Sequence, residues 1–289
     1  MKPAPFVYYR PTTADEAVHM LAEAGEDAHV LAGGQSLIPM MNFRLAQPGH
    51  LVDINFIDEL DYIRAEEGWL AVGARVRQVA LERSEQAAGA APLVTEAMHY
   101  VGHPPVRHRG TIAGSIAHAD PAAELPAVLL ALGGDVLVRG LRGERRIPAG
   151  ELFQGPLMTA IGPDELVTEV RFPRAPAHSG HALVEVTRRH ADFAVAGAVV
   201  QLRLADGAIE DVRIALFGVA GTPVRATEAE RLLQGASEER PREASDAAVA
   251  DLEPSPDVHG GIDYRRRAAK ACVQRALERA LEGTGRGAS

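Results

Sequence analysis

The sequence of 289 residues contains a single cysteine, Cys272. One thiol forms no disulfide within the chain, and it cannot complete a thiolate-bound iron–sulfur cluster or a cysteine zinc site. Aromatic residues are also few, at 4%, and the formal net charge is −9. A nucleic-acid partner needs stacking surfaces and positive charge, so this composition argues against nucleic-acid binding.

Long apolar runs are absent as well. No stretch approaches the roughly 20 apolar residues that a membrane-spanning helix needs, and residues 1–6 lack the apolar region of a signal peptide. We therefore expect a cytoplasmic protein without a transmembrane segment. With 46% apolar residues, the chain is long enough to bury a core and to divide into two or three subdomains.

Two turns of small residues stand out, Ala-Gly-Gly-Gln-Ser at 32–36 and Thr-Ile-Ala-Gly-Ser at 111–115. Their glycines, Gly33, Gly34 and Gly114, allow positive φ and a close approach of the backbone to a ligand. Exposed N–H groups in such turns form an anion-binding nest, which a following helix N-terminus strengthens. The pair predicts one phosphate-rich ligand held by two turns, although either turn alone is more often a matter of chain geometry.

Hydrophobic periodicity and turn residues predict a mixture of short helices and strands. Capping boxes that begin at Thr13 and Thr227 mark two helix starts, and Asp206-Gly207 predicts a hairpin turn. We predict helices over 14–24, 37–45, 76–81, 92–98, 122–132 and 269–281. We predict strands over 28–32 (buried), 51–55, 69–74, 135–139, 166–172, 182–187, 194–204 and 212–217, the last three forming an antiparallel sheet.

The run Pro-Pro-Val-Arg-His-Arg-Gly at 104–110 precedes the second turn. Its prolines argue against regular helix, and Arg107, His108 and Arg109 are expected to place positive charge beside the anion site. The segment 173–180 has the composition of a linker, so we place a domain boundary there.

Other side chains suggest sites that the sequence supports less well. His99, His103, His108 and His118 lack the clustered cysteines or carboxylates of a metal site, so we predict none. Ser36 and Ser115 lack the Gly-x-Ser-x-Gly elbow of a nucleophile, so we expect hydroxyl-to-phosphate hydrogen bonds and assign no catalytic residue. The basic residues of the last helix form either a partner surface or a solvated face, and the second is commoner: Arg265, Arg266, Arg267, Lys270, Arg275 and Arg279.

The amino-acid sequence around the two turns, over 31–42 and 109–126, resembles that of the FAD-binding medium subunit of molybdenum hydroxylases. That family includes the flavoprotein subunits of carbon monoxide dehydrogenase and of xanthine dehydrogenase-type enzymes. The resemblance extends along nearly the whole chain, through 6–11, 165–173, 188–194 and 264–266.

This resemblance implies an α+β protein with a two-lobed FAD-binding domain of the vanillyl-alcohol-oxidase (PCMH) type and a small C-terminal α/β domain with an antiparallel sheet. We place the FAD-binding domain at 1–176, with lobes of about 1–56 and 57–176, and the C-terminal domain, similar to that of carbon monoxide dehydrogenase flavoproteins, at 177–289.

The resemblance also implies the residues around FAD. The two turns would wrap the pyrophosphate, Glu124 and Asp120 would lie near the flavin and its ribityl chain, and Leu166 would lie near a backbone contact to the isoalloxazine. The implied cofactor-binding residues are Ala32, Gly33, Gly34, Gln35, Ser36, Thr111, Ile112, Ala113, Gly114, Ser115, Asp120, Glu124 and Leu166.

The chain departs from the family pattern at three of its positions. Gln35 stands where some relatives have His or Thr, and Ala113 where glycine is common. We expect Ala113 to keep φ below zero and Gly114 to take the unusual angle. Phe193 stands where some relatives have Tyr, and a ring without its hydroxyl over the flavin would alter the flavin's reactivity toward oxidants.

Family membership implies an oxidoreductase subunit that passes electrons from [2Fe–2S] clusters through FAD to an external acceptor, which is quinone, NAD or oxygen. A large subunit with a molybdenum-pterin centre and a small subunit with two [2Fe–2S] clusters would be the partners, in a dimer of heterotrimers. Such a complex is cytoplasmic or peripheral at the inner face of the membrane. A self-contained FAD-dependent reductase or oxidase and a binding module without flavin are the alternatives.

Overall fold

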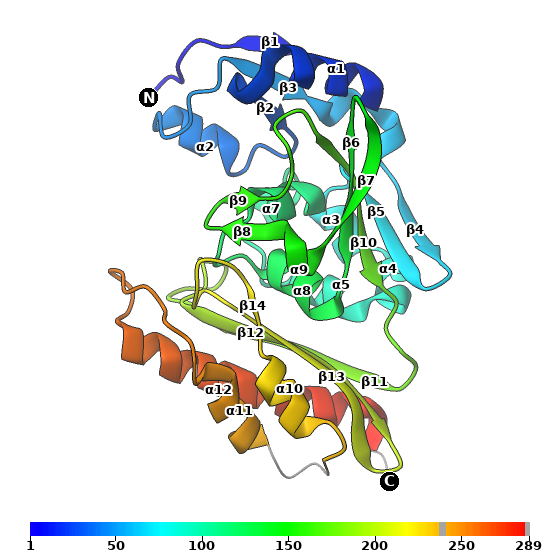
Figure 1. Cartoon of the computed structure of the whole chain (residues 1–289), viewed down its shortest axis with the longest axis vertical. Coiled ribbons are helices and arrows are strands. Elements are labelled where there is room, and N and C mark those ends of the chain that lie inside the picture. Colours follow the sequence, from blue (N-terminus) through cyan, green and yellow to red (C-terminus); the bar gives the residue numbers. More distant parts are fainter. Residues whose placement is uncertain (237–240, 287–289) are drawn as a thin grey trace.

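A computed structural model describes residues 1–236 and 241–286. Its three main sheets follow one another along the long axis of the molecule (Figure 1), and each is built from a later part of the chain than the one before. The first has three strands, the second five and the third four. No helix in the described ranges is long and apolar enough to cross a membrane.

The first sheet is parallel and has the strand order β1-β3-β2. Its strands are β1 (Val7–Tyr9), β2 (Ala28–Leu31) and β3 (His50–Asp53). The helix α1 (Ala14–Ala24) begins as predicted, because the Thr13 hydroxyl accepts the Glu16 N–H at 3.1 Å. The prediction that β2 is buried is wrong: as an edge strand it leaves its side chains partly exposed.

The second sheet is antiparallel and has the order β4-β5-β10-β6-β7. Its strands are β4 (Ile63–Glu66), β5 (Trp69–Gly73), β6 (Asp135–Gly140), β7 (Gly143–Pro148) and β10 (Leu166–Pro173). The helix α2 (Leu37–Asn42) lies earlier in the chain, between β2 and β3. The helices in the part of the chain that forms the second sheet are α3 (Gln78–Glu82), α4 (Glu85–Ala90), α5 (Pro92–Ala97), α6 (Pro104–Arg107), α7 (Ile112–His118), α8 (Glu124–Leu132) and α9 (Ala149–Leu152). A small hairpin joins β8 (Phe153–Gly155) to β9 (Met158–Thr159).

Two predictions about the middle of the chain are wrong. The prolines at 104–105 begin the one-turn helix α6, since proline fits the first turn, where its missing N–H has no helical partner. The stretch 111–115 is not a free turn, because Thr111 caps α7 and the next four residues form its first turn.

The third sheet confirms the predicted antiparallel arrangement, with the order β11-β12-β13-β14. Its strands are β11 (Ser179–Val186), β12 (Ala196–Ala205), β13 (Ala208–Phe217) and β14 (Val224–Arg225). Asp206 and Gly207, with φ of 48° and 83°, make the predicted hairpin turn.

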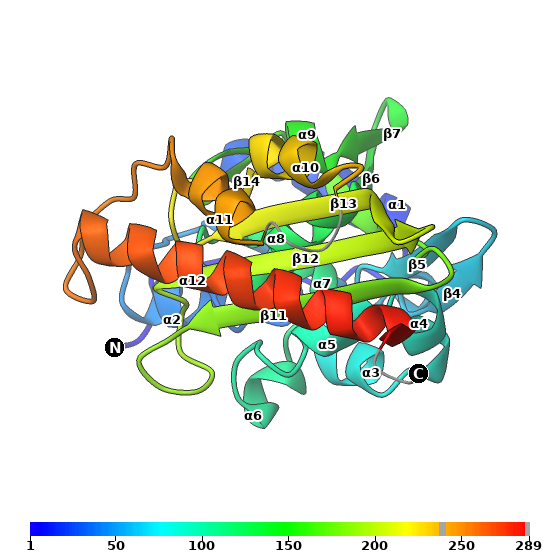
Figure 2. The ribbon, with the colours of Figure 1, turned by 90° about the horizontal axis from the view of Figure 1, so that it is seen from below.

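Three helices cover the outer face of the third sheet (Figure 2). They are α10 (Thr227–Leu233), α11 (Pro241–Val249) and α12 (Ile262–Leu281). The predicted cap at Thr227 is wrong: Ala226 precedes the helix, and the Glu230 carboxylate pairs with Arg225 and accepts the Ile214 N–H instead. The other face contributes Leu183, Val199 and Phe217 to one core with α5 and α8, so the boundary at 173–180 stays a prediction.

Candidate functional site

A cavity of about 800 Å³ opens between α2, α7 and the loops that precede β12 and α12. This volume lies in the usual range for small-molecule and cofactor sites. Both segments singled out in the sequence, 32–36 and 111–115, line it. The tertiary structure therefore brings together two segments that lie far apart in the sequence.

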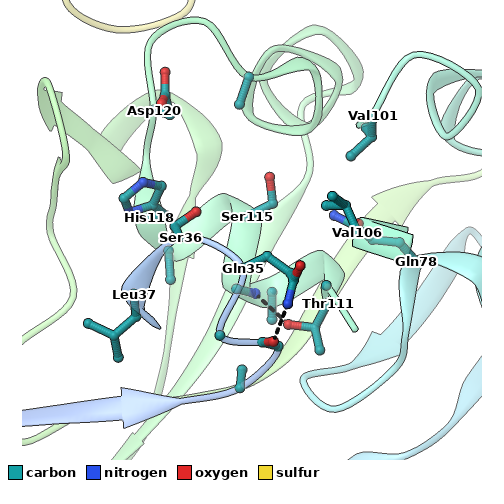
Figure 3. Close-up of a pocket in the computed structure, with 18 of the residues that line it drawn as sticks. Gln35, Ser36, Leu37, Gln78, Val101, Val106, Thr111, Ser115, His118 and Asp120 are labelled. Carbon is teal, nitrogen blue, oxygen red and sulfur yellow. Dashed lines mark hydrogen bonds between the residues drawn. The ribbon is translucent and has the colours of Figure 1, made fainter. Parts of the chain in front are cut away.

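Segment 32–36 carries the chain from the end of β2 into α2. Gly34 has a φ of 70°, which redirects the backbone, and the Gln35 Nε2 donates to the Gly33 carbonyl at 3.2 Å (Figure 3). Ser36 precedes α2 without capping it through its side chain, so its hydroxyl stays available. Within the described chain, no acceptor takes the N–H groups of Gln35, Ser36 and Leu37.

Segment 111–115 is the start of α7. The Thr111 Oγ1 accepts the Gly114 N–H at 3.0 Å, which is the capping bond of this helix (Figure 3). Gly114 does not have positive φ, so the prediction that it takes an unusual angle is wrong: it lies in a regular helical turn. The Ala113 N–H has no acceptor in the described part of the chain, and the Ser115 side chain borders the cavity.

Glycines allow a close approach between segment 32–36 and the chain at 109–115. A Cβ on Gly33 would lie 2.4 Å from the Arg109 carbonyl oxygen and 2.7 Å from the Gly110 Cα. A Cβ on Gly114 would lie 3.7 Å from that of Ala32 and 2.7 Å from the Thr111 Oγ1. Because backbone cannot yield as a side chain does, Gly33 is the residue that permits this contact.

Asn55 and Arg77 connect the two segments through hydrogen bonds outside the cavity lining. The Asn55 Nδ2 donates to the Ala32 carbonyl at 2.9 Å, and its Oδ1 accepts a bond from Arg77. Arg77 also donates to the Arg109 carbonyl, and the Gln78 N–H donates to the Gly110 carbonyl at 2.9 Å. We call Asn55 and Arg77 the bracket, because they fix the spacing of the two segments.

Positive charge is not where the sequence predicted it. Arg107 pairs with Glu82 at 2.9 Å and donates to the Gly102 carbonyl at 2.7 Å. Neither Arg107, His108 nor Arg109 lines the cavity, and Arg188 is the single arginine or lysine among its described lining residues. Neutral N–H and O–H donors therefore dominate the wall that would face an anion.

Acidic side chains on the cavity wall differ in their electrostatic environment. Burial, with a smaller effect from Asp120, raises the pKa of Glu124 to about 7. Glu165 behaves in the opposite way: hydrogen bonds from Arg145 at 2.7 and 2.6 Å lower its pKa. At neutral pH, Glu165 is a paired carboxylate whereas Glu124 holds a proton for part of the time.

The structure adds residues that the sequence did not single out. Gln78, Val101 and Val106 form a wall opposite the first segment (Figure 3), and the buried Gln78 Oε1 has no partner among the described residues. His259 and Arg188 lie at the cavity with a ring-nitrogen-to-guanidinium distance of 3.4 Å. These contacts join distant parts of the chain, so no local pattern marked them.

Of the thirteen residues expected around a cofactor, twelve line the cavity. The exception is Ile112, whose side chain is fully buried in the core. Phe193 lies at the cavity with 73% of its surface exposed.

The basic residues of the last helix were expected to form either a partner surface or a solvated face. Arg265 is buried and donates to the Val195 and Gly218 carbonyls at 2.7 Å, so this residue belongs to neither kind of surface.

Two of the histidines considered in the sequence analysis have identified surroundings in the structure. His99 lies 3.7 Å from Glu82, and His118 lines the cavity without a ligand set around it. Over 1–236 and 241–286, no group of three or more His, Cys, Asp or Glu side chains is placed to hold a metal ion.

Comparison with known proteins identifies the class. Residues 4–175 match the family described as the FAD binding domain in molybdopterin dehydrogenase, and residues 181–280 match the carbon monoxide dehydrogenase flavoprotein C-terminal domain. The first match alone spans more than half of the chain. The chain is a member of the family of FAD-binding medium subunits of molybdenum hydroxylases, and it is an oxidoreductase subunit.

Individual relatives agree over almost the full length. The 6-hydroxypseudooxynicotine dehydrogenase complex subunit alpha of Paenarthrobacter nicotinovorans is 42% identical, with 97% of this chain and 96% of the relative covered. The caffeine dehydrogenase subunit beta of a Pseudomonas strain is 39% identical over 98% and 97%. A solved carbon monoxide dehydrogenase chain from Hydrogenophaga pseudoflava superposes with a TM-score of 0.95 at 40% identity, covering 98% and 99%.

The cavity fits the FAD that the family binds. Its unpaired N–H donors suit a pyrophosphate, and its volume suits a cofactor. The unpartnered Oε1 of Gln78 can accept a hydroxyl donor.

Proposed function

We propose that this chain is the electron-transfer subunit of its complex. A molybdenum-pterin centre on a large partner subunit reduces the [2Fe–2S] clusters on a small partner subunit. The FAD of this chain receives electrons from these clusters and passes the electrons to quinone, NAD or oxygen. The observation that carries the proposal is the cavity in which 32–36 and 111–115 meet, in a chain with one cysteine.

The environment of that cysteine supports the placement of the iron–sulfur clusters on another subunit. Cys272 is buried on α12, and burial raises the pKa of its thiol to about 12. A thiol that stays protonated is a poor metal ligand. The clusters that feed the flavin therefore belong on another chain.

Within the cavity, we assign the pyrophosphate to the unpaired amides of Gln35, Ser36, Leu37 and Ala113 with the hydroxyls of Ser36 and Ser115. We assign Asp120 and Glu124 to the ribityl chain and Leu166 to the isoalloxazine. FAD supplies the redox chemistry, while this chain binds and orients it and sets its electrostatic environment.

Purification together with the neighbouring gene products tests the proposal. We expect one FAD released per chain on denaturation, and molybdenum and iron in the complex but none in the isolated chain. Size-exclusion chromatography should give the mass of a dimer of heterotrimers. A flavin-free native complex supports the binding-module alternative, and a lone chain that turns over substrate without molybdenum or iron supports the self-contained oxidase or reductase.

The acceptor and the placement in the cell are tested separately. Reoxidation of the reduced complex by quinone, NAD or oxygen, compared at equal concentrations, identifies the acceptor by the fastest rate. Fractionation of cells distinguishes a cytoplasmic complex from one held peripherally at the inner face of the membrane.

A further inference from the structure

The start of α12 carries a buried arginine that binds three separate segments of the chain. Arg265 is only 7% exposed. Its Nη1 donates to the carbonyls of Val195 and Gly218 at 2.7 Å each, and its Nη2 pairs with the Asp257 carboxylate at 2.6 Å. A buried guanidinium is costly unless it is paired and hydrogen-bonded. These partners therefore fix the side chain, and the side chain in turn fixes the three segments.

The contact with Asp257 leads to the cavity through His259. The Asp257 Oδ1 accepts the N–H groups of His259 at 2.8 Å and of Gly260 at 3.1 Å. The His259 Nδ1 lies 3.4 Å from the Arg188 Nη1, and it accepts a hydrogen bond in the tautomer with its proton on Nε2. Both His259 and Arg188 line the cavity. A continuous series of contacts therefore joins the buried Arg265 to Arg188.

Arg188 belongs to the loop between β11 and β12, and this loop is held near both of its ends. Near the start of the loop, His259 contacts Arg188. At the end of the loop, the Val195 carbonyl accepts the hydrogen bond from Arg265. Residues 191–193, between these two points, also line the cavity. Arg265 thus acts on one end of the loop directly and on the other through the series of contacts.

The contact with Gly218 leads to another part of the cavity wall. Gly218 has a φ of 74°, and its N–H donates to the Pro121 carbonyl at 2.7 Å. Pro121 directly follows Asp120, which lines the cavity and which we assign to the ribityl chain of FAD. Arg265 therefore connects the loop of Arg188 with the wall assigned to the middle of the cofactor, because the ribityl chain joins the pyrophosphate to the isoalloxazine.

Arg188 is the positive charge that this arrangement places at the cavity. It is exposed, and it is the single arginine or lysine among the described lining residues. His259 is its partner, and no carboxylate of the described residues pairs with it. A cation without a paired carboxylate keeps its attraction for the anion of a ligand. FAD has such a charge on its pyrophosphate, and its isoalloxazine carries one after gaining two electrons and one proton.

We propose that Arg188 meets a negative charge of the bound FAD, and that Arg265 is the positioning residue that holds Arg188 there through Asp257 and His259. The inference rests on the proposed binding of FAD in this cavity. All four residues lie within 181–280, the part of the chain that matches the C-terminal domain. This domain therefore completes the cofactor site.

Ligand titration and potentiometry of the full chain test the charge and distinguish its two sources. ADP has a pyrophosphate group but no isoalloxazine. If Arg188 meets the pyrophosphate, Arg188→Gln should weaken the binding of both FAD and ADP about tenfold. If it meets the reduced isoalloxazine, the affinity for ADP should stay unchanged. Reduced FAD should then lose about tenfold in preference over oxidised FAD, which lowers the two-electron potential, measured with dithionite and a reference dye, by about 30 mV.

Arg189→Gln is the matched control for this substitution. Arg189 is the next residue of the same loop, is also exposed and lies outside the cavity lining. Its replacement removes the same charge from the chain and should leave both affinities and the potential unchanged. Wild-type affinities and potential in a folded Arg188→Gln chain overturn the proposal. Equal effects of the two substitutions also overturn it, because they show a general attraction and no specific contact.

A double-mutant cycle tests the positioning. His259→Phe removes the Nδ1 acceptor but keeps a planar ring, so it should reproduce part of the effect of Arg188→Gln. In a chain that already carries Arg188→Gln, His259→Phe should have no further effect on affinity or potential, because the side chain that His259 positions is gone. Additive effects overturn the positioning, since a purely structural role of His259 does not depend on Arg188.

Arg265→Lys extends the cycle to the buried arginine. Lysine keeps a charge for Asp257 but lacks the planar fork that serves both carbonyls. We expect a lower urea midpoint together with the loss of affinity or potential seen in Arg188→Gln, and no further such loss once Arg188 is replaced. If Arg265→Lys does not fold, the cycle with His259→Phe decides the question.

Failure of this inference is distinguishable from failure of the proposed function. If the wild-type complex holds no FAD, it is the proposed function that fails. If the complex holds FAD and Arg188→Gln behaves as the wild type, the proposed function stands and the role of Arg188 is wrong.

Discussion

Segments 32–36 and 111–115 both present small residues to the cavity, yet their glycines solve different problems. Gly34 has a φ of 70° and turns the backbone at the end of β2, whereas Gly33 allows the backbone at Arg109 and Gly110 to approach. Gly114 has neither role, since it sits in a regular turn of α7 beside the Thr111 hydroxyl. The similar composition of the two segments predicts a shared ligand. Their different contacts predict that the two segments tolerate substitution unequally.

The largest effect should come from Gly33→Ala. Its Cβ meets backbone atoms of Arg109 and Gly110 at 2.4 and 2.7 Å, so segment 32–36 must move away from the chain that leads into 111–115. We expect loss of FAD and a decrease of about 3 kcal/mol in the free energy of unfolding, the upper end for overpacking. Flavin content after denaturation and urea unfolding measure both.

Gly89→Ala provides the matched control for that substitution. Gly89 lies in α4, and a Cβ there meets no atom within 4 Å. This change should stabilise the chain by about 0.5 to 1 kcal/mol, the helix preference of alanine over glycine, with full flavin content. Equal flavin content in the two variants would show that the contact at Gly33 does not shape the site.

Gly34→Val should come next. Valine at positive φ costs about 1 to 2 kcal/mol, and the Cβ approaches the Ile38 side chain at 3.0 Å. Gly34→Asn is the comparison, because asparagine tolerates the left-handed region far better. We expect FAD to dissociate more readily from the valine variant, as measured by fluorescence of the released flavin. If both variants hold FAD equally, the positive φ is not what the site requires.

Asn55→Ala breaks the bracket without touching the cavity lining. The Ala32 carbonyl and Arg77 each lose a partner, which should cost about 1 to 2 kcal/mol and weaken FAD binding roughly tenfold. Asn42→Ala is the control, since no hydrogen bond of its side chain is found in the described structure. Isothermal titration of the apoprotein with FAD measures the difference, and equal affinities would contradict the role of the bracket.

Gly114→Ala should have the smallest effect. Its Cβ meets the Thr111 Oγ1 at 2.7 Å, so the cap is disturbed at a cost of about 1 kcal/mol. The better helix propensity of alanine offsets about the same amount. We expect nearly unchanged unfolding and mostly retained FAD, and a complete loss of FAD would show that the cap positions the cofactor.

Local patterns predicted the elements well where the cause was local. The Thr13 cap, the Asp206-Gly207 turn and the antiparallel sheet are fixed by neighbouring residues, and the structure confirms them. Predictions failed where a partner outside the recognised motif decided the outcome. Arg107 was expected at the anion site but is held by Glu82, and the Thr227 box failed because Arg225 and Ile214 take Glu230.

The candidate site shows the same division. Its two small-residue segments were visible in the sequence because a ligand that contacts backbone needs small residues at that place. Gln78, Asn55 and Arg77 were not visible, because their roles depend on where three separate stretches of chain cross. Even Glu124, expected beside the flavin, has its pKa of about 7 from burial that only packing creates.

The sequence by itself determined the family, the alternation of helices and strands, and the two segments suited to a phosphate, since these depend on residue identity and spacing. The tertiary structure decided that Gly33 rather than Gly114 makes the close contact, and that neutral donors rather than Arg107 face the cavity. Distances, burial and charge pairing between remote segments set these properties, and they exist only once the chain has folded.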